Sequence, residues 1–173
     1  MGSIRPVFGQ GVYYIASSGT IFHTVVYEYY DEAKEYYSLL KSGMHALEEE
    51  RLKKAMQDLL GNDKVIVNGV QASPRVIDAR IESRGYKRLS SATFHILIGY
   101  KPLEGRNVLE VFYEPTKAEY SYVIDWIVDK CMTIVELDTD GIVESTERTA
   151  RVRVRKGEKL RGHEALIFDK RKC

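Results

Sequence analysis

The chain has 173 residues, with 26 Lys and Arg against 25 Asp and Glu, which gives a formal net charge of +1. A chain of this length buries roughly 70% of the surface that its unfolded form exposes, so its core needs neither a metal nor a disulfide. Hydrophobic residues (44%) and charged residues (29%) stand in globular proportions, which excludes a disordered chain. The balanced charge excludes a global field that would draw the chain to nucleic acid or a membrane.

Cysteine content and hydropathy bear on location. Two cysteines, Cys131 and Cys173, are too few for a disulfide framework, and we expect Cys131 to be a small core residue at the start of a strand. No run approaches the roughly 18 apolar residues of a membrane-spanning helix. Residues 1–25 contain no long apolar stretch of the kind a secretory signal has. The sequence therefore predicts a cytoplasmic protein with no membrane partner.

Taken in chain order, the first predicted element is a β-hairpin. Residues 12–15 and 21–30 are rich in Val, Ile and Tyr, which favour strands, and Ser17-Ser18-Gly19 between them is typical of a turn. The Gly and Pro residues in 1–11 predict an irregular start.

A pair of helices is predicted over residues 31–60. Asp31 is a suitable N-cap, and apolar residues then recur at helical spacing until Ser42-Gly43 interrupts them. The pattern resumes up to Gly61-Asn62, a typical helix stop. The segment is two helices or one helix kinked at Gly43. Because each helix must bury its apolar stripe, the segment is a candidate surface for homo-oligomer formation.

From Lys64 onward the apolar residues alternate, which predicts strands. Asn68-Gly69 is a strong signal for a two-residue hairpin turn. Seven further strands are expected at 75–82, 92–100, 107–114, 119–128, 131–138, 149–156 and 164–169. The predicted fold class is α+β, an N-terminal hairpin and helix pair (residues 1–63) followed by an antiparallel β-sandwich-like domain (residues 64–173).

Two strands show clear inward faces, and one residue type is unusually common. Alternate residues of 92–98 and of 119–128 are apolar or aromatic, so we expect them to face the core. The chain has twelve tyrosines beside five Phe and one Trp. Tyrosine suits half-buried strand positions, and it also suits a recognition surface, because its ring is apolar and its tip polar.

The best-defined candidate binding feature is a basic strand. Arg151, Arg153 and Arg155 alternate with valines and are followed by Lys156, so the three arginines share one face. Such a strip could hold phosphate groups of a nucleic acid or another polyanion. The alternative is a charged outer strand that resists aggregation and pairs with neighbouring acids.

The candidate acidic cluster is Glu110, Glu114 and Asp125. Glu110 and Glu114 share a face if their strand is unbroken, and Asp125 points away from its apolar neighbours. Paired carboxylates with different pKa values would suit a small hydrolase. The alternative is a solvated acidic surface.

No cofactor or metal site is predicted. The four histidines, His23, His45, His95 and His163, have no partner at a metal-ligand spacing. The run from Asp138 to Gly141 lacks the ligands of a calcium loop and is expected to be a turn. Gly9-Gln10-Gly11 lacks the third glycine of a dinucleotide site.

Residues of about 64–169 resemble uncharacterised proteins of thermophilic archaea. The segments that carry the resemblance are residues 65–70, 74–76, 105–110, 113–114, 118–122 with Trp126, and 152–157. The resemblance implies no activity. The leading hypothesis is a non-enzymatic binding or assembly module, with a polyanion-binding protein and a carboxylate-based hydrolase as the alternatives.

Overall fold

The computed structural model describes residues 4–172, and most of them belong to β-strands. Seven strands form a large sheet in the order β11-β12-β9-β1-β2-β6-β5, and five form a small sheet in the order β10-β14-β7-β3-β4. Strands β8 and β13 pair separately. The elements are β1 (Ile4–Ala16), β2 (Thr20–Asp31), α1 (Glu35–Ser42), α2 (His45–Leu60), β3 (Lys64–Val67), β4 (Val70–Ala72), β5 (Arg75–Ser83), β6 (Leu89–Gly99), β7 (Gly105–Phe112), β8 (Thr116–Lys117), β9 (Ser121–Val128), β10 (Met132–Asp138), β11 (Ile142–Ser145), β12 (Thr149–Val154), β13 (Lys159–Leu160) and β14 (His163–Lys170).

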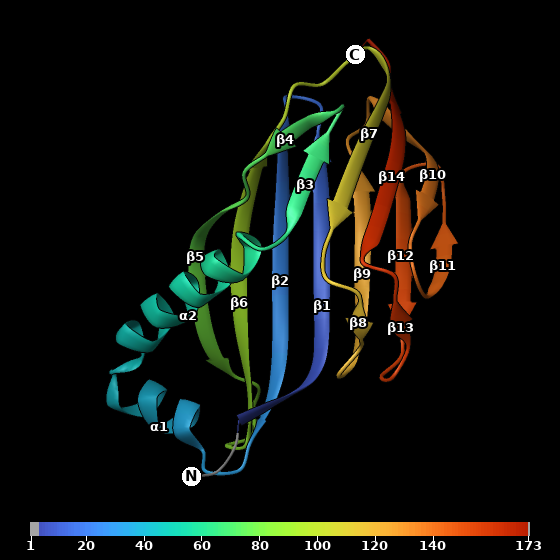
Figure 1. Ribbon diagram of the computed structural model, residues 1–173. Helices are drawn as coiled ribbons and strands as arrows, with labels where there is room; N and C mark the ends of the chain where they lie inside the picture. The colour runs from blue at the N-terminus through green and yellow to red at the C-terminus, as the bar shows by residue number, and fades with distance from the viewer. Residues whose placement is uncertain (1–3, 173) are drawn as a thin grey trace.

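The small sheet and the helices lie on the same side of the large sheet (Figure 1). The helices pack over β5, and the small sheet extends from beside them across the centre of the large sheet toward β9 and β12. One buried cluster draws side chains from both sheets and from α2, including Ile96, Trp126, Phe168 and Met56. The core therefore lies between the layers, and the far face of the large sheet is its outer face.

The longest strands, β1 and β2, occupy the centre of the large sheet. They pair with each other in antiparallel fashion, β2 pairs with β6, and β1 pairs with β9 in parallel. The parallel pair departs from the predicted antiparallel arrangement. The boundary predicted at residue 63 falls between α2 and β3, and the first two strands are hydrogen-bonded on both sides to strands from beyond it.

The start of the chain is more regular than predicted. Strand β1 begins at Ile4 rather than near residue 12, so the expectation of an irregular start is wrong for the described residues. Pro6 is accommodated because the register with β2 shifts between Pro6 and Phe8. The glycines at 9 and 11 lie within the strand rather than interrupting it.

Both helices begin and end for local reasons. Helix α1 starts at Glu35, later than predicted, because Asp31 is the last residue of β2. The Asp31 carboxylate is buried and its Oδ2 accepts the backbone N–H of Tyr36 at 2.9 Å, so it still caps the helix. Gly43, at φ 72°, ends α1, so the segment is two helices.

Turn and face predictions hold for several strands. Asn68 and Gly69 join β3 to β4 with φ values of 53° and 77°, the geometry of the predicted hairpin turn. Phe94, Ile96 and Ile98 are all buried, as predicted. Strands β8, β11 and β13 were not predicted, because each is short and lies within polar sequence.

Two further findings concern Cys131 and the membrane. Cys131 is disulfide-bonded and only partly buried, so the expectation of a small core residue is wrong. Cys173, the chain's other cysteine, lies outside the described residues. Within residues 4–172, neither helix has the length and hydropathy needed to cross a bilayer.

Candidate functional site: a cavity between the two sheets

A cavity of about 230 Å³ lies between the large sheet and one end of the small sheet. We call it the inter-sheet cavity. Strands β1, β2 and β9 form one wall, and residues at the ends of β3, β7 and β14 form the other. Five of the twelve tyrosines line it, namely Tyr13, Tyr27, Tyr113, Tyr120 and Tyr122.

The large-sheet wall consists of three rows of inward-facing residues that run across β9, β1 and β2. In the first row a glycine lies between two tyrosines, in the second a glycine lies between two aliphatic residues, and the third is aromatic throughout. The rows, in the order β9, β1, β2, are Tyr122, Gly9 and Tyr27; Ile124, Gly11 and Val25; and Trp126, Tyr13 and His23.

The two glycines have different roles in that wall. A Cβ atom on Gly9 would approach the Tyr120 ring to 3.0 Å, so glycine there allows this ring to lie against the strand. A Cβ atom on Gly11 would make ordinary contacts of 3.6 Å with His23 and Ile124. A longer side chain at Gly11 would therefore project into the cavity, which exists partly because that side chain is absent.

The third row closes the cavity with a stack of rings. Tyr13 lies between His23 and Trp126, with centroid separations of 3.7 Å and 4.1 Å and nearly parallel planes. His23 borders the cavity, but the surrounding rings and strands exclude most water from its imidazole. This burial lowers the pKa of His23 to about 3, so the ring is neutral at physiological pH.

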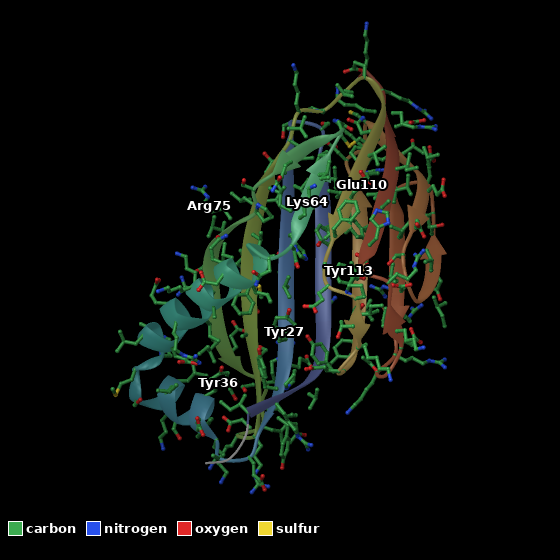
Figure 2. The ribbon with its side chains drawn as sticks, in the orientation of Figure 1. Tyr27, Tyr36, Lys64, Arg75, Glu110 and Tyr113 are labelled. Carbon is green, nitrogen blue, oxygen red and sulfur yellow. The ribbon has the colours of Figure 1, made fainter. Side chains whose placement is uncertain are left out.

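The small-sheet wall brings three polar residues together. Asp63 precedes β3, Tyr113 follows β7, and Glu164 is the second residue of β14. The antiparallel registers pair Val111 with both Val65 and Glu164, which places all three polar residues at the same end of the sheet. Figure 2 shows Tyr113 on this wall and Tyr27 on the large sheet, in the region between the layers.

The two acidic residues of the cavity differ in burial, because Glu164 is buried and Asp63 is only partly buried. Burial raises the pKa of Glu164 above its ordinary value, although the hydrogen bond from the Thr139 hydroxyl to Oε1 (2.7 Å) partly opposes the shift. Burial also raises the pKa of Asp63, which has no hydrogen bond or ion pair with any described residue. None of the cavity's lining residues is Lys or Arg.

Arg161, whose charge acts on Glu164, is already engaged. Its guanidinium binds Asp138 and Asp140, each at 2.8 Å, within the turn that the sequence suggested. The two acids therefore outnumber it, and Glu164 gains little net compensation. Burial and Glu164 together raise the pKa of the Tyr113 hydroxyl, which is buried and has no hydrogen-bond partner among the described residues.

A second hollow of about 150 Å³ adjoins the first beneath α2. The residues that it shares with the inter-sheet cavity are Tyr13, His23, Val25, Tyr27, Asp63 and Val111. Its other lining residues are apolar, among them Met56 and Leu60. The two hollows therefore form a polar chamber with an apolar extension.

Arg151 and Arg153 of the predicted basic strip lie elsewhere, on the outer face of the large sheet, whereas β12 ends at Val154, so the prediction that Arg155 shares their strand face is wrong. Arg151 binds Asp125 through two hydrogen bonds of 2.6 and 2.8 Å, and Arg153 binds Glu144 at 2.6 Å. Arg155 and Lys156 form no ion pair with any described residue. A groove of about 410 Å³ beside Arg151 is lined mainly by polar groups that already bind one another.

The predicted acidic cluster is not brought together. Asp125 lies on β9 of the large sheet and binds Arg151. Glu110 lies on β7 of the small sheet, 3.3 Å from His163 Nε2, and Figure 2 shows it farther along β7 from Tyr113. Strand β7 ends at Phe112, so the parity linking Glu110 to the exposed Glu114 fails. Within residues 4–172, no three His, Cys, Asp or Glu side chains form a metal site.

The sequence motifs did not predict the cavity. Asp63 and Glu164 were not singled out, because isolated acids near strand ends are common. Two signals could have indicated it: the abundance of tyrosine, and the alternate glycines Gly9 and Gly11, which leave one face of β1 without side chains but were interpreted as signs of an irregular start.

Comparisons with known proteins give no family. No protein-family model and no curated protein matches the chain. Weak structural likenesses are found to a putative protease from Parabacteroides distasonis (TM-score 0.36, 8% identity, 95% of this chain and 40% of that one) and to an aminopeptidase N family protein from Idiomarina loihiensis (0.43, 7%, 92% and 29%). A third is to native yeast LTA4 hydrolase (0.34, 10%, 96% and 29%). This chain spans 40% or less of those proteins, and likenesses this weak support no conclusion about its activity.

Proposed function

We propose that this protein is a non-enzymatic binding module and that its ligand site is the inter-sheet cavity. The supporting observation is a hollow of about 230 Å³ lined by Asp63, by the buried Glu164 and by Tyr113, whose buried hydroxyl has no hydrogen-bond partner among the described residues. Protein interiors are densely packed, and their polar groups are nearly all hydrogen-bonded. A hollow that breaks both rules is typical of a ligand site.

The proposal is tested with variants whose side chains fill the cavity. Gly11→Leu projects a side chain over the cavity floor, whereas Gly11→Ala adds one methyl group at ordinary contact distance. A panel of small neutral, cationic and anionic molecules is screened against each protein by ligand-observed NMR. We expect at least one class to bind the unmodified protein, Gly11→Leu to abolish that binding, and Gly11→Ala to weaken it less.

Two outcomes would overturn the proposal. One is the absence of any binder in the panel, and the other is binding that Gly11→Leu leaves unchanged. If Gly11→Leu does not fold, Ile124→Phe narrows the cavity from the neighbouring strand and serves the same purpose. Circular dichroism of each variant shows whether the fold is kept.

The proposal also includes the predicted β-sandwich-like arrangement and the predicted cytoplasmic location. The core shared by the two sheets supports a β-sandwich-like description of the strands, with the helices as a separate layer. A cytoplasmic location remains part of the proposal, although the disulfide at Cys131 weighs against a strongly reducing compartment. Measuring the redox state of Cys131 in cell extracts would settle that point.

The assembly hypothesis rests on the helices. Met44 and Leu47 are 62% and 79% exposed around the start of α2, so two large apolar side chains of residues 31–60 have no cover within the chain. This supports self-association through residues 31–60. Light scattering that gives a strict monomer at high protein concentration would rule it out.

The polyanion hypothesis is weaker, because acidic neighbours neutralise Arg151 and Arg153. Only Arg155 and Lys156 of the strip keep their charge for a partner. A gel shift that detects no complex with DNA or RNA at low salt would exclude it.

The hydrolase hypothesis moves from the predicted acids to Glu164, a buried carboxylate beside a cavity. Acid–base pairs usually have pKa values pushed in opposite directions, whereas burial raises the pKa of both Glu164 and Asp63. The cavity therefore favours binding over hydrolysis. Turnover of chromogenic ester or glycoside substrates that Glu164→Gln abolishes would reverse this preference.

A further inference from the structure

The inter-sheet cavity has an unbalanced charge, and this imbalance points to its ligand. We propose that the cavity binds a small organic cation, such as an amine or quaternary ammonium head group, between its tyrosine rings and the carboxylates of Asp63 and Glu164. This inference rests on the proposed binding function and adds the chemical class of the ligand.

The charged residues that line the cavity are all acidic. Two carboxylates line the cavity, no Lys or Arg does, and His23 is neutral. Burying a carboxylate is costly unless a positive group or several hydrogen bonds compensate for the lost water. The protein supplies Glu164 with one hydrogen bond, from Thr139, and Asp63 with none from the described residues. A cation between them would supply the missing compensation, whereas an anion would add to the repulsion.

Tyrosine rings line the large-sheet wall of the cavity. Tyr27 and Tyr122 lie on either side of Gly9, and the Tyr120 ring lies over Gly9. These three rings border the same part of the cavity, and a cation interacts favourably with an aromatic face within about 6 Å of its centroid. Tyr120 packs edge to face against Tyr27 at 6.0 Å and adds a third ring on the same side. Tyrosine cages of this kind suit ammonium groups that carry methyl or methylene carbons.

The cavity does not suit a metal ion or a larger ligand. Calcium takes six to eight oxygen ligands, at roughly 2.3–2.6 Å, and aromatic faces give it none. No group of three metal-ligating acids, histidines or cysteines exists among residues 4–172. The cavity of about 230 Å³ is smaller than the roughly 300–1,000 Å³ of drug-sized pockets, so it fits a head group. An apolar tail could extend into the hollow beneath α2.

The experiment compares two molecules of the same shape and different charge. Choline chloride is titrated into the full chain by calorimetry, and 3,3-dimethyl-1-butanol, its neutral carbon analogue, is titrated under the same conditions. Sodium chloride at equal ionic strength controls for salt. We expect choline to bind at least about tenfold more tightly than the neutral analogue, because only the cation interacts with the carboxylates and the ring faces.

Variants locate the effect. Asp63→Asn and Glu164→Gln keep the shape of the cavity and remove one charge each, and we expect each to weaken choline binding about fivefold or more. Glu119→Gln is the matched control, because Glu119 is an exposed carboxylate next to Tyr120 and outside the cavity. We expect this control to bind choline as the unmodified protein does. Equal losses in all three variants would overturn the inference, because they would indicate a long-range charge effect.

The results separate this inference from the proposed function. If choline and its neutral analogue bind equally and Gly11→Leu abolishes both, the cavity is a ligand site but the cation inference is wrong. If neither binds while another class in the panel does, the same conclusion holds. If no molecule of any class binds, both proposals are wrong.

Discussion

A tyrosine and an acid can be compared above the inner face of the large sheet and on its outer face, where they are in opposite circumstances. On the inner face, Tyr13 is stacked between two rings and Glu164 faces it from the small sheet without a cationic partner. On the outer face, Tyr14 is 39% exposed, and Asp125 binds Arg151 through two hydrogen bonds. Adjacent residues of a strand point to opposite faces, so one position along the chain separates the two circumstances.

The difference shows on which face the acidic side chains lack ion-pair partners. The outer acid Asp125 has the partner it needs and requires nothing further. The inner acids, the buried Glu164 and the partly buried Asp63, line a cavity that has no Lys or Arg, which costs stability in the free protein. An arrangement that costs stability is typical of a functional site rather than of the scaffold. The comparison can be tested residue by residue.

The largest expected effect comes from the two adjacent tyrosines. Tyr13→Ala removes the middle ring of a buried stack, and truncating a buried aromatic residue typically costs about 3–5 kcal/mol. Tyr14→Ala removes a ring from the outer face, where we expect less than about 1 kcal/mol. Urea unfolding followed by circular dichroism measures both changes. Similar losses at the two positions would show that the inner stack contributes no more than the exposed ring.

The next effect is a gain in stability. Burial raises the pKa of Glu164, so its ionised form is disfavoured in the folded state. Glu164→Gln removes that charge and can still accept the hydrogen bond from Thr139. We expect the free energy of unfolding at neutral pH to rise by on the order of 1 kcal/mol in the absence of ligand. Thermal unfolding measures the change, and Glu119→Gln is the control that should show none.

The pH dependence of that gain follows from the direction of the pKa shift. The folded protein holds the Glu164 proton more tightly than the unfolded chain does, so its stability falls as pH rises from the ordinary pKa of glutamate through the raised one. Glu164→Gln cannot lose a proton, and its advantage should therefore appear above that range and vanish at about pH 4. The groups that also act on Glu164 are Asp140, His163 and Arg161, all of which the variant retains. A gain of equal size at pH 4 would indicate a packing effect instead of a charge effect.

Much of the fold could be predicted, because local patterns determined it. The alternation in residues 92–98 predicted their buried face, Asn68-Gly69 predicted a two-residue turn, and Gly43 predicted the division of the helices. In each case neighbouring residues carry the whole signal. The start of β1 was missed because Pro6, Gly9 and Gly11 resemble loop residues, although a register shift and an inner hollow accommodate them.

The site could not be predicted, because it depends on pairing between distant segments. Tyr122 and Gly9 become neighbours only through the parallel pairing of β1 with β9, which no local pattern encodes. Asp63 and Glu164 meet only because β3 and β14 flank β7. The predicted basic strip and acidic cluster did contain a true relation, since Arg151 and Asp125 are bound to each other, but as partners on the outer face rather than as a site.

The smallest expected effect concerns that outer pair. Arg151 and Asp125 face each other across β12 and β9, with side chains 47% and 16% exposed, and ion pairs open to solvent usually contribute about 0.2–1 kcal/mol. A double-mutant cycle of Arg151→Ala and Asp125→Ala, measured by urea unfolding, isolates their coupling from other losses. We expect a coupling below about 1 kcal/mol that decreases further in high salt, because salt screens exposed charges. A coupling of several kcal/mol that salt does not change would mean that the outer acid, like the inner ones, is shielded from water, and the contrast between the two faces would disappear.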